Sequence, residues 1–233
     1  MPKDTAAVVL AAGSGRRLGG GNKALLLLGG EPLLAHSLRA LAAAPSVAEI
    51  TLVLPAADLR ALQERYGVDV AALGATRVVD GGPERWLSSR NGCAAADALL
   101  PYLLVHDAAR PLVQPELVEA VLAGARRAGA ALAAEPLDDT LKLADADSRV
   151  LRTLPRSGLW RAQTPQAFRR ELLLQGFAAW SERTPPTDEC MLVEALGARP
   201  VLVPAPSSNC KVTRAADVEL AEALLLQRRS AAT

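Results

Sequence analysis

The sequence contains little cysteine, and its three cysteines are too few and too widely spaced to define a site. Cys93, Cys190 and Cys210 form no CxxC pair, which argues against a zinc motif and against a disulfide scaffold. We therefore expect a protein of the reducing cytoplasm. No apolar segment approaches the roughly 20 residues that a membrane helix needs, so we expect no membrane partner.

The sequence also has a small net charge and no internal repeats. The formal net charge is +1 over 233 residues, half of them apolar, which argues against a disordered chain and against a strongly basic nucleic-acid binder. The sequence has no internal repeat and no low-complexity linker. We therefore predict a single domain over residues 1–233, with no nucleic-acid partner. The apolar run near the N-terminus leads directly into Gly-Ser-Gly-Arg-Arg, and we interpret it as a first strand rather than a secretory signal.

Short β-type runs alternate with longer segments rich in alanine and leucine. We predict strands at 7–11, 50–54, 77–79, 103–105, 130–134 and 200–203, and helices at 32–43, 57–66, 84–99, 115–127, 169–180, 189–196 and 214–228. This alternation is typical of an α/β fold with a Rossmann-like, mostly parallel sheet and helices on both faces. Ligands of such folds gather at the carboxyl ends of the strands.

Residues 135–159 break this alternation. Two extended pieces, 140–143 and 149–154, flank the polar segment Ala-Asp-Ala-Asp-Ser. Two such runs around a polar turn predict a β-hairpin. We therefore expect a hairpin arm that protrudes from the α/β layout.

The first predicted strand runs into a loop rich in glycine and arginine. Glycines let backbone N–H groups converge on phosphate oxygens, and Arg16, Arg17 and Lys23 add positive charge. The loop has Leu18 where a dinucleotide fingerprint needs its third glycine, so an NAD-dependent oxidoreductase is supported only by Gly13-x-Gly15 and the alternating pattern. Lys23 also lacks the neighbours of a Walker A lysine. The loop predicts a polyphosphate site of another type.

The loop resembles the signature Leu-Ala-Ala-Gly-x-Gly-x-Arg, followed by Lys, of nucleotidyltransferases of the sugar-phosphate type. Further stretches match one family in its own order: 81–88 (Gly-Gly-Pro-Glu-Arg-Trp-Leu-Ser), 105–111 (Val-His-Asp-Ala-Ala-Arg-Pro), 159–168 (Leu-Trp-Arg-Ala-Gln-Thr-Pro-Gln-Ala-Phe), 187–189 (Thr-Asp-Glu) and 209–213 (Asn-Cys-Lys-Val-Thr). Together they resemble the 2-C-methyl-D-erythritol 4-phosphate cytidylyltransferases of the non-mevalonate isoprenoid pathway. The chain departs from the family pattern at Asn22, where proline is usual, at Ser89 and at Cys210.

The resemblance implies a nucleotidyltransferase fold and an activity. The expected reaction transfers CMP from CTP to 2-C-methyl-D-erythritol 4-phosphate, giving 4-diphosphocytidyl-2-C-methyl-D-erythritol and pyrophosphate. It implies Mg²⁺ or another divalent cation as cofactor, and CTP and a polyol phosphate as partners. It also implies a homodimer in which the arm, 135–159, reaches the neighbouring subunit. Because the chain ends shortly after its last predicted helix, we expect no fused cyclase domain.

The resemblance also implies site residues. The catalytic charge stabilisers would be Arg17, Lys23 and Lys211, and Asp107, at the end of a predicted strand, would hold the metal. The nucleotide would contact Ala11, Ala12, Gly13, Ser14, Gly15, Gly81, Gly82, Arg85, Ser88, Asp107 and Ala108. The acceptor would contact Asp107, Arg110, Thr140, Arg156, Thr164, Thr187 and Lys211. We expect His106 to orient or pack rather than to ligate, and Arg110 to contact either a phosphate or a carboxylate.

Two further alternatives stay open. A ribitol 5-phosphate cytidylyltransferase shares the glycine loop and the Asp-Ala-x-Arg-Pro region. A catalytically silent nucleotide-binding regulator could share the fold, although it would have lost charged site residues, and Arg17, Lys23, Asp107 and Lys211 are all present. Turnover with different acceptors separates these alternatives.

Overall fold

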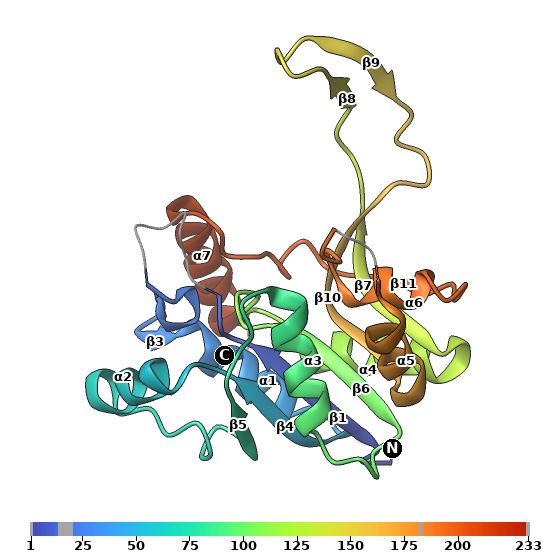
Figure 1. The fold of residues 1–233 in the computed structure, drawn as a ribbon. Coiled ribbons are helices and arrows are strands. Elements are labelled where there is room, and N and C mark those ends of the chain that lie inside the picture. Colours follow the sequence, from blue (N-terminus) through green and yellow to red (C-terminus); the bar gives the residue numbers. More distant parts are fainter. Residues whose placement is uncertain (1, 14–20, 182–183, 232–233) are drawn as a thin grey trace.

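A seven-stranded sheet forms the centre of the molecule. The computed structural model describes residues 2–13, 21–181 and 184–231. The strands of the sheet are β1 (Thr5–Leu10), β4 (Val47–Val53), β5 (Arg77–Val79), β6 (Tyr102–Asp107), β7 (Ala130–Pro136), β10 (Trp160–Arg169) and β11 (Val201–Pro204). Their order is β11-β7-β10-β6-β1-β4-β5 (Figure 1). Among these described strands, only β10 pairs antiparallel with its neighbours, β6 and β7. The predicted mostly parallel sheet is therefore confirmed.

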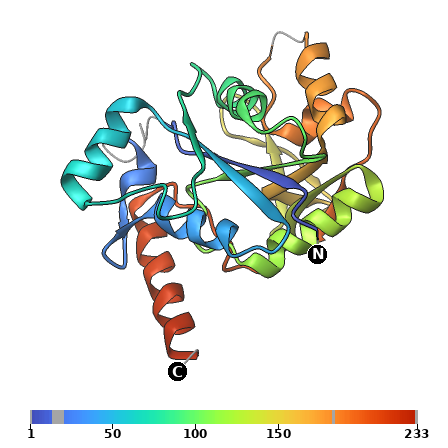
Figure 2. The same cartoon turned by 90° about the horizontal axis from the view of Figure 1, so that it is seen from below.

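Helices cover both faces of the sheet. They are α1 (Leu33–Ala42), α2 (Ala56–Tyr66), α3 (Arg85–Ala95), α4 (Pro115–Ala128), α5 (Arg170–Ala179), α6 (Glu189–Glu194) and α7 (Ala215–Ala231). Successive side chains of β1 show why, because they alternate between two buried clusters. Ala7 and Val9 pack with α1 and α4, whereas Ala6 and Val8 pack with α3 and α5. Figure 2 shows these two helix layers on opposite sides of the sheet.

A third, smaller cluster lies under α7. Its buried members include Leu28, Leu33 and Ala221, which join α7 to α1 and to a short hairpin of β2 (Leu27–Leu28) and β3 (Glu31–Pro32). A single 3-10 turn, η2 (Lys23–Leu25), precedes this hairpin. Among the described residues, no helix combines the length and the apolar character needed to cross a membrane.

Most predicted element boundaries lie within a few residues of the observed ones, but four features differ. The β2–β3 hairpin and the turn η2 before it were not predicted. β10 was not predicted as a strand, because Pro165 lacks a ladder donor and the segment is rich in polar residues; a register shift between Ala162 and Gln166 accommodates them. The predicted helix 84–99 ends at Ala95, since Ala96 is extended. Pro32 precedes α1 instead of opening it.

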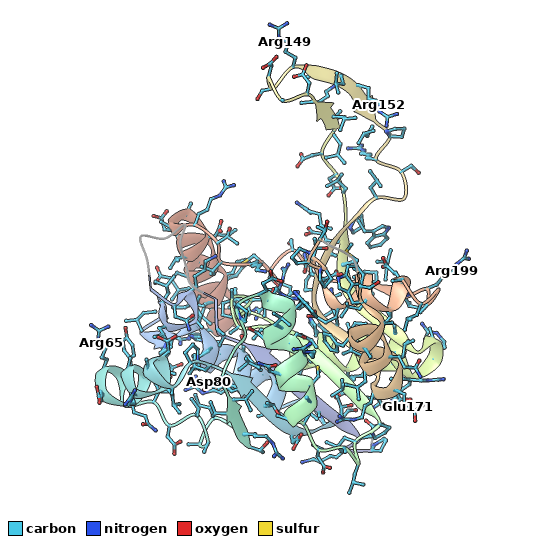
Figure 3. All side chains as sticks on the ribbon, in the orientation of Figure 1. Arg65, Asp80, Arg149, Arg152, Glu171 and Arg199 are labelled. Atoms are coloured by element: carbon cyan, nitrogen blue, oxygen red, sulfur yellow. The ribbon has the colours of Figure 1, made fainter. Side chains whose placement is uncertain are left out.

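The predicted hairpin arm is present. β8 (Leu141–Ala144) and β9 (Val150–Leu154) pair antiparallel and stand away from the body on two extended legs that continue β7 and β10 (Figure 1). Arg149 and Arg152 point into solvent near its far end (Figure 3). The apolar side chains of Val150 and Leu151 are about 60% exposed, so the arm carries apolar surface that this chain leaves uncovered.

Candidate active site

A pocket of about 710 Å³ opens at the carboxyl ends of β1 and β6, where Leu10 pairs with Asp107. Parallel strands bring their carboxyl ends to one edge of the sheet, so loops from distant parts of the sequence converge there. The lining residues are Leu10, Ala11, Ala12, Gly13, Asn22, Lys23, Ala24, Gly82, Pro83, Glu84, Arg85, Ser88, Asp107, Ala109 and Lys211. The pocket therefore joins both ends of the glycine loop to three of the other motifs.

Asp107 lies between two cations. Arg85 donates to its Oδ1 from Nε at 3.1 Å and from Nη2 at 2.9 Å, and Lys211 Nζ donates to its Oδ2 at 2.6 Å. Burial raises the pKa of Asp107, but the charges of Arg85 and Lys211 outweigh burial and hold this pKa well below its usual range. Asp107 is therefore ionised, and the two side chains that donate to its carboxylate are cations that can also meet phosphate.

Glu189, the first residue of α6, holds Arg85 from the other side. Its carboxylate is fully buried and accepts from Arg85 Nη1 at 2.8 Å and Nη2 at 3.1 Å. Burial lowers the pKa of Arg85, but the charges of Glu189 and Asp107 outweigh it and raise this pKa. The two carboxylates bind different edges of the guanidinium. Asp107 accepts from the Nε–Nη2 edge, and Glu189 accepts from the Nη1–Nη2 edge. From the sequence, Glu189 was assigned no role. A carboxylate among the apolar residues of a predicted helix could have indicated a buried acid that needs a cationic partner.

A chain of hydrogen bonds fixes the backbone at Asp107. Its N–H donates to Thr164 Oγ1 at 3.0 Å, and this hydroxyl lies 3.2 Å from His106 Nδ1. His106 Nε2 lies 3.2 Å from the Arg110 carbonyl oxygen. Since a carbonyl only accepts, Nε2 carries the hydrogen and Nδ1 accepts from Thr164. Thr164, expected as an acceptor contact, is buried and serves the neighbouring backbone.

His106 is fully buried, and burial lowers its pKa to about 4 from an ordinary value of 6.5. The unfolded chain therefore binds more protons than the folded one between these values, so stability falls as pH decreases through this window. We expect a loss on the order of 3 kcal/mol from pH 6.5 to pH 4, at about 1.4 kcal/mol per unit. Urea unfolding across this range measures the loss.

The matched variant for this pH dependence is His106→Gln, whose amide offers a donor and an acceptor but does not titrate. Its free energy of unfolding should vary less with pH than that of the parent between pH 6.5 and pH 4. An equal slope in both proteins would assign the dependence to other groups.

Lys211 reaches the pocket because the segment before it is anchored in the core. Asn209 Nδ2 donates to Gln163 Oε1 at 2.8 Å and to the Thr164 carbonyl at 3.0 Å. Arg110, expected as a phosphate contact or carboxylate partner, donates from Nη1 to the Asn209 carbonyl at 2.7 Å. These buried contacts tie the 209–213 segment to β10 and to the 107–111 turn. Sequence reasoning assigned no role to Gln163 or Asn209.

The 81–88 segment is shaped by two glycines and a serine. A Cβ at Gly81 would lie 2.5 Å from Ala12 Cβ, and one at Gly82 would lie 2.6 Å from Leu87 Cβ, so neither position has space for a larger residue. Ser88 Oγ accepts from Gly82 N at 2.9 Å and lies 3.1 Å from the Glu84 carbonyl oxygen. Two of the expected base contacts, Gly81 and Ala12, therefore pack directly against each other.

The remaining expected residues lie elsewhere. Ser14, Gly15 and Arg17 fall outside the described residues. Ala108 is buried in the core, and Ala109 lines the pocket in its place. Thr187 is exposed and lines a second pocket between β7, β10, α6 and β11. Thr140 and Arg156 are exposed, lie directly before β8 and shortly after β9, and are not among the residues that line the pocket.

Comparison with known proteins places this geometry in one family. The family model "IspD: 2-C-methyl-D-erythritol 4-phosphate cytidylyltransferase" matches residues 5–227. The chain is 47% identical to a "Bifunctional enzyme IspD/IspF" of Anaeromyxobacter dehalogenans over 94% of this chain and 56% of that protein. It is 46% identical to a 2-C-methyl-D-erythritol 4-phosphate cytidylyltransferase of Frankia casuarinae, over 94% of this chain and 80% of the relative.

A solved structure agrees with this relationship. The crystal structure of the 2-C-methyl-D-erythritol 4-phosphate cytidylyltransferase from Thermus thermophilus is similar to this fold with a TM-score of 0.76 at 35% identity. The match covers 94% of this chain and 97% of that one. The chain thus spans nearly all of the single-function structure and about half of the bifunctional relative. It belongs to the 2-C-methyl-D-erythritol 4-phosphate cytidylyltransferase family.

Proposed function

We propose that the chain transfers the cytidylyl group of CTP to 2-C-methyl-D-erythritol 4-phosphate and releases pyrophosphate, the reaction for which its family is named. The observation that carries the proposal is the group of Arg85, Asp107 and Lys211 in a pocket at the strand ends, beside the two described ends of the glycine loop. A silent regulator is less well supported, because the described charged residues meet at this pocket.

The reaction needs charge and position more than an acid or a base. An oxygen of the acceptor phosphate forms a bond to the α-phosphorus of CTP. The bond from that phosphorus to the oxygen bridging to the β-phosphate breaks, and pyrophosphate leaves with the electron pair. Because the nucleophile is already an anion, no proton has to be removed from it. Cations that hold both anions in line lower the barrier.

Lys23 and Lys211 line the pocket from opposite parts of the sequence. In our proposal Lys23 holds the triphosphate next to the glycine loop, and Lys211 meets the α-phosphate. Lys211 Nζ is 2.6 Å from Asp107 Oδ2, so an incoming phosphate oxygen and this carboxylate compete for the same ammonium group. Ala11, Ala12, Gly82 and the backbone beside Ser88 would face the base.

We also propose Mg²⁺ as the cofactor, held by Asp107. Within the described residues no three His, Cys, Asp or Glu side chains come together as a metal cage. A single carboxylate combined with substrate phosphates is a usual way to bind Mg²⁺, so the donor set fits. When bound beside Asp107, the ion would supply positive charge that offsets the charge of the substrate phosphates. The free cysteines support our further proposal that the enzyme works in the reducing cytoplasm.

We propose that a second copy of the chain completes each site. Thr140 and Arg156, expected as acceptor contacts, are exposed on either side of the β8–β9 hairpin and are not part of the described lining of the pocket in their own chain. Leu143, Val150 and Leu151 expose apolar surface on the arm. A two-fold dimer in which each arm lies on the partner would bury this surface and bring Arg156 to the partner's pocket.

Mixing two inactive variants tests the shared site. Arg156→Ala and Lys23→Ala are each expected to be inactive, but a mixed dimer has one site with both groups intact. Random exchange makes half of the dimers mixed with one good site each, so about a quarter of parental activity should return. Native mass spectrometry verifies the exchange. A verified mixture that stays inactive would show that Arg156 acts within its own chain.

A pyrophosphate-release screen tests the proposed function. Four nucleoside triphosphates are combined with a panel of polyol phosphates that includes ribitol 5-phosphate. We expect release with CTP and 2-C-methyl-D-erythritol 4-phosphate, and little with the other pairs, since a base that leaves polar groups of the pocket unpaired costs about 1–3 kcal/mol. Preference for ribitol 5-phosphate, or CTP binding without turnover on any acceptor, would overturn the proposal.

A further inference from the structure

Asn22, the residue before Lys23, uses its whole amide group. Its Nδ2 donates to the Ala11 carbonyl at 2.5 Å and to Asp58 Oδ2 at 2.8 Å, and its Oδ1 accepts from Ala24 N at 3.0 Å. An asparagine amide has two donor hydrogens, and both are used here. One side chain thus connects the end of β1, the first turn of α2 and the turn η2.

These bonds fix the backbone from which Lys23 extends. Asn22 is the N-cap of η2, and Lys23 is the first residue of that turn. The contact to Ala11 ties the turn to the strand end that lines the pocket. The contact to Asp58 ties it to α2, and Asp58 itself is outside the described pocket lining. Asp58 therefore contacts a residue of the pocket lining, Asn22, without lining the pocket itself.

We propose that Asn22 and Asp58 form a positioning pair that holds Lys23 within reach of the triphosphate; this proposal rests on the proposed function. Asn22 stands at the position where the family resemblance expects proline. A proline would restrict the turn through its own ring, whereas this chain restricts it through contacts with two distant elements. Neither Asn22 nor Asp58 is a catalytic residue in this proposal.

Isosteric exchange of the two side chains tests the pair. Asn22→Asp removes both donors and places two carboxylates face to face. We expect it to weaken CTP binding about tenfold, the loss typical of a hydrogen bond to a charged group. In Asn22→Asp/Asp58→Asn the donor and acceptor are exchanged, and we expect binding to recover about threefold, since the Ala11 contact stays lost. Asp58→Asn alone should change binding less than about twofold, because its amide oxygen still accepts.

Calorimetric titration with CTP reads out binding without any turnover, so it separates this proposal from the proposed reaction. Asn91→Asp is the matched control, because Asn91 is exposed on α3 and outside the described pocket lining; it should bind CTP as the parent does. In turnover assays, Asn22→Asp should raise the KM for CTP and leave the KM for the acceptor unchanged. Parental CTP affinity in Asn22→Asp, no recovery in the exchanged pair, or an equal rise of both KM values would overturn the proposal.

Discussion

Replacing Lys211 by alanine is expected to lower kcat by about 10²- to 10³-fold, the usual cost of removing one charge stabiliser of a transition state. Lys211 Nζ is 2.6 Å from Asp107 Oδ2 at the strand ends, where our proposal has it meet the α-phosphate. The side chain of Lys211 is 39% exposed and Asp107 keeps its contact with Arg85, so we expect the loss of this ion pair to cost little folding stability. Steady-state pyrophosphate release gives kcat, and the melting temperature should stay close to that of the parent.

Two variants sharpen this expectation. Lys3→Ala removes an exposed lysine that precedes β1, at the opposite end of that strand from the pocket, and should leave kcat unchanged. Lys211→Arg keeps the charge but replaces a compact ammonium by a planar fork, so it should recover only part of the rate. A Lys211→Ala enzyme with parental kcat and a raised KM would mean that Lys211 only binds substrate.

Replacing Glu189 by alanine is expected to cost about 3 kcal/mol of unfolding free energy, near the lower end of the range for breaking a buried ion pair. The lower end applies because Arg85 keeps its contact with Asp107. Glu189 itself is fully buried, and both of its oxygens accept from Arg85. Urea denaturation measures the loss. Glu189→Gln, which keeps the shape and one acceptor oxygen, should lose less.

The matched control for this variant is Glu171→Ala. Glu171 lies in the first turn of α5, as Glu189 does in the first turn of α6, but its side chain points into solvent (Figure 3). Its loss should cost about 0.5 kcal/mol through the helix dipole alone. If both variants lost the same small amount, Glu189 would be acting as an ordinary helix-terminal acid, and its contact with Arg85 would not stabilise the fold.

The sequence was most informative where local pattern decides the structure. Apolar runs followed by helical segments predicted the parallel part of the sheet, and the position of Asp107 after such a run placed it at a strand end. The arm was also visible as two extended runs around a polar turn. β10 was missed, because its pairing with β6 and β7 depends on partners distant in the sequence and not on its own polar, proline-containing pattern.

The candidate site could be predicted from the sequence only in part, for the same reason. Lys211, Arg85 and Asp107 were all expected from the family resemblance, but their pairing was not, because Asp107 lies 104 residues from Lys211 and 22 from Arg85. Glu189 lies 104 residues from Arg85. Such contacts depend on how elements pack, and no local propensity encodes them. These contacts involve buried charges, which are stable only when they are paired with an opposite charge.

The most direct test of the account is phosphorus NMR of a reaction of the purified chain with CTP, 2-C-methyl-D-erythritol 4-phosphate and Mg²⁺. We predict that the three CTP signals disappear together with the monoester signal. A pyrophosphate signal and two coupled signals of a diphosphate linkage should replace them, because one α-phosphorus exchanges its bond to the β-phosphate oxygen for a bond to the acceptor phosphate. Unchanged CTP, or CTP cleaved to CMP with the monoester intact, would contradict the account.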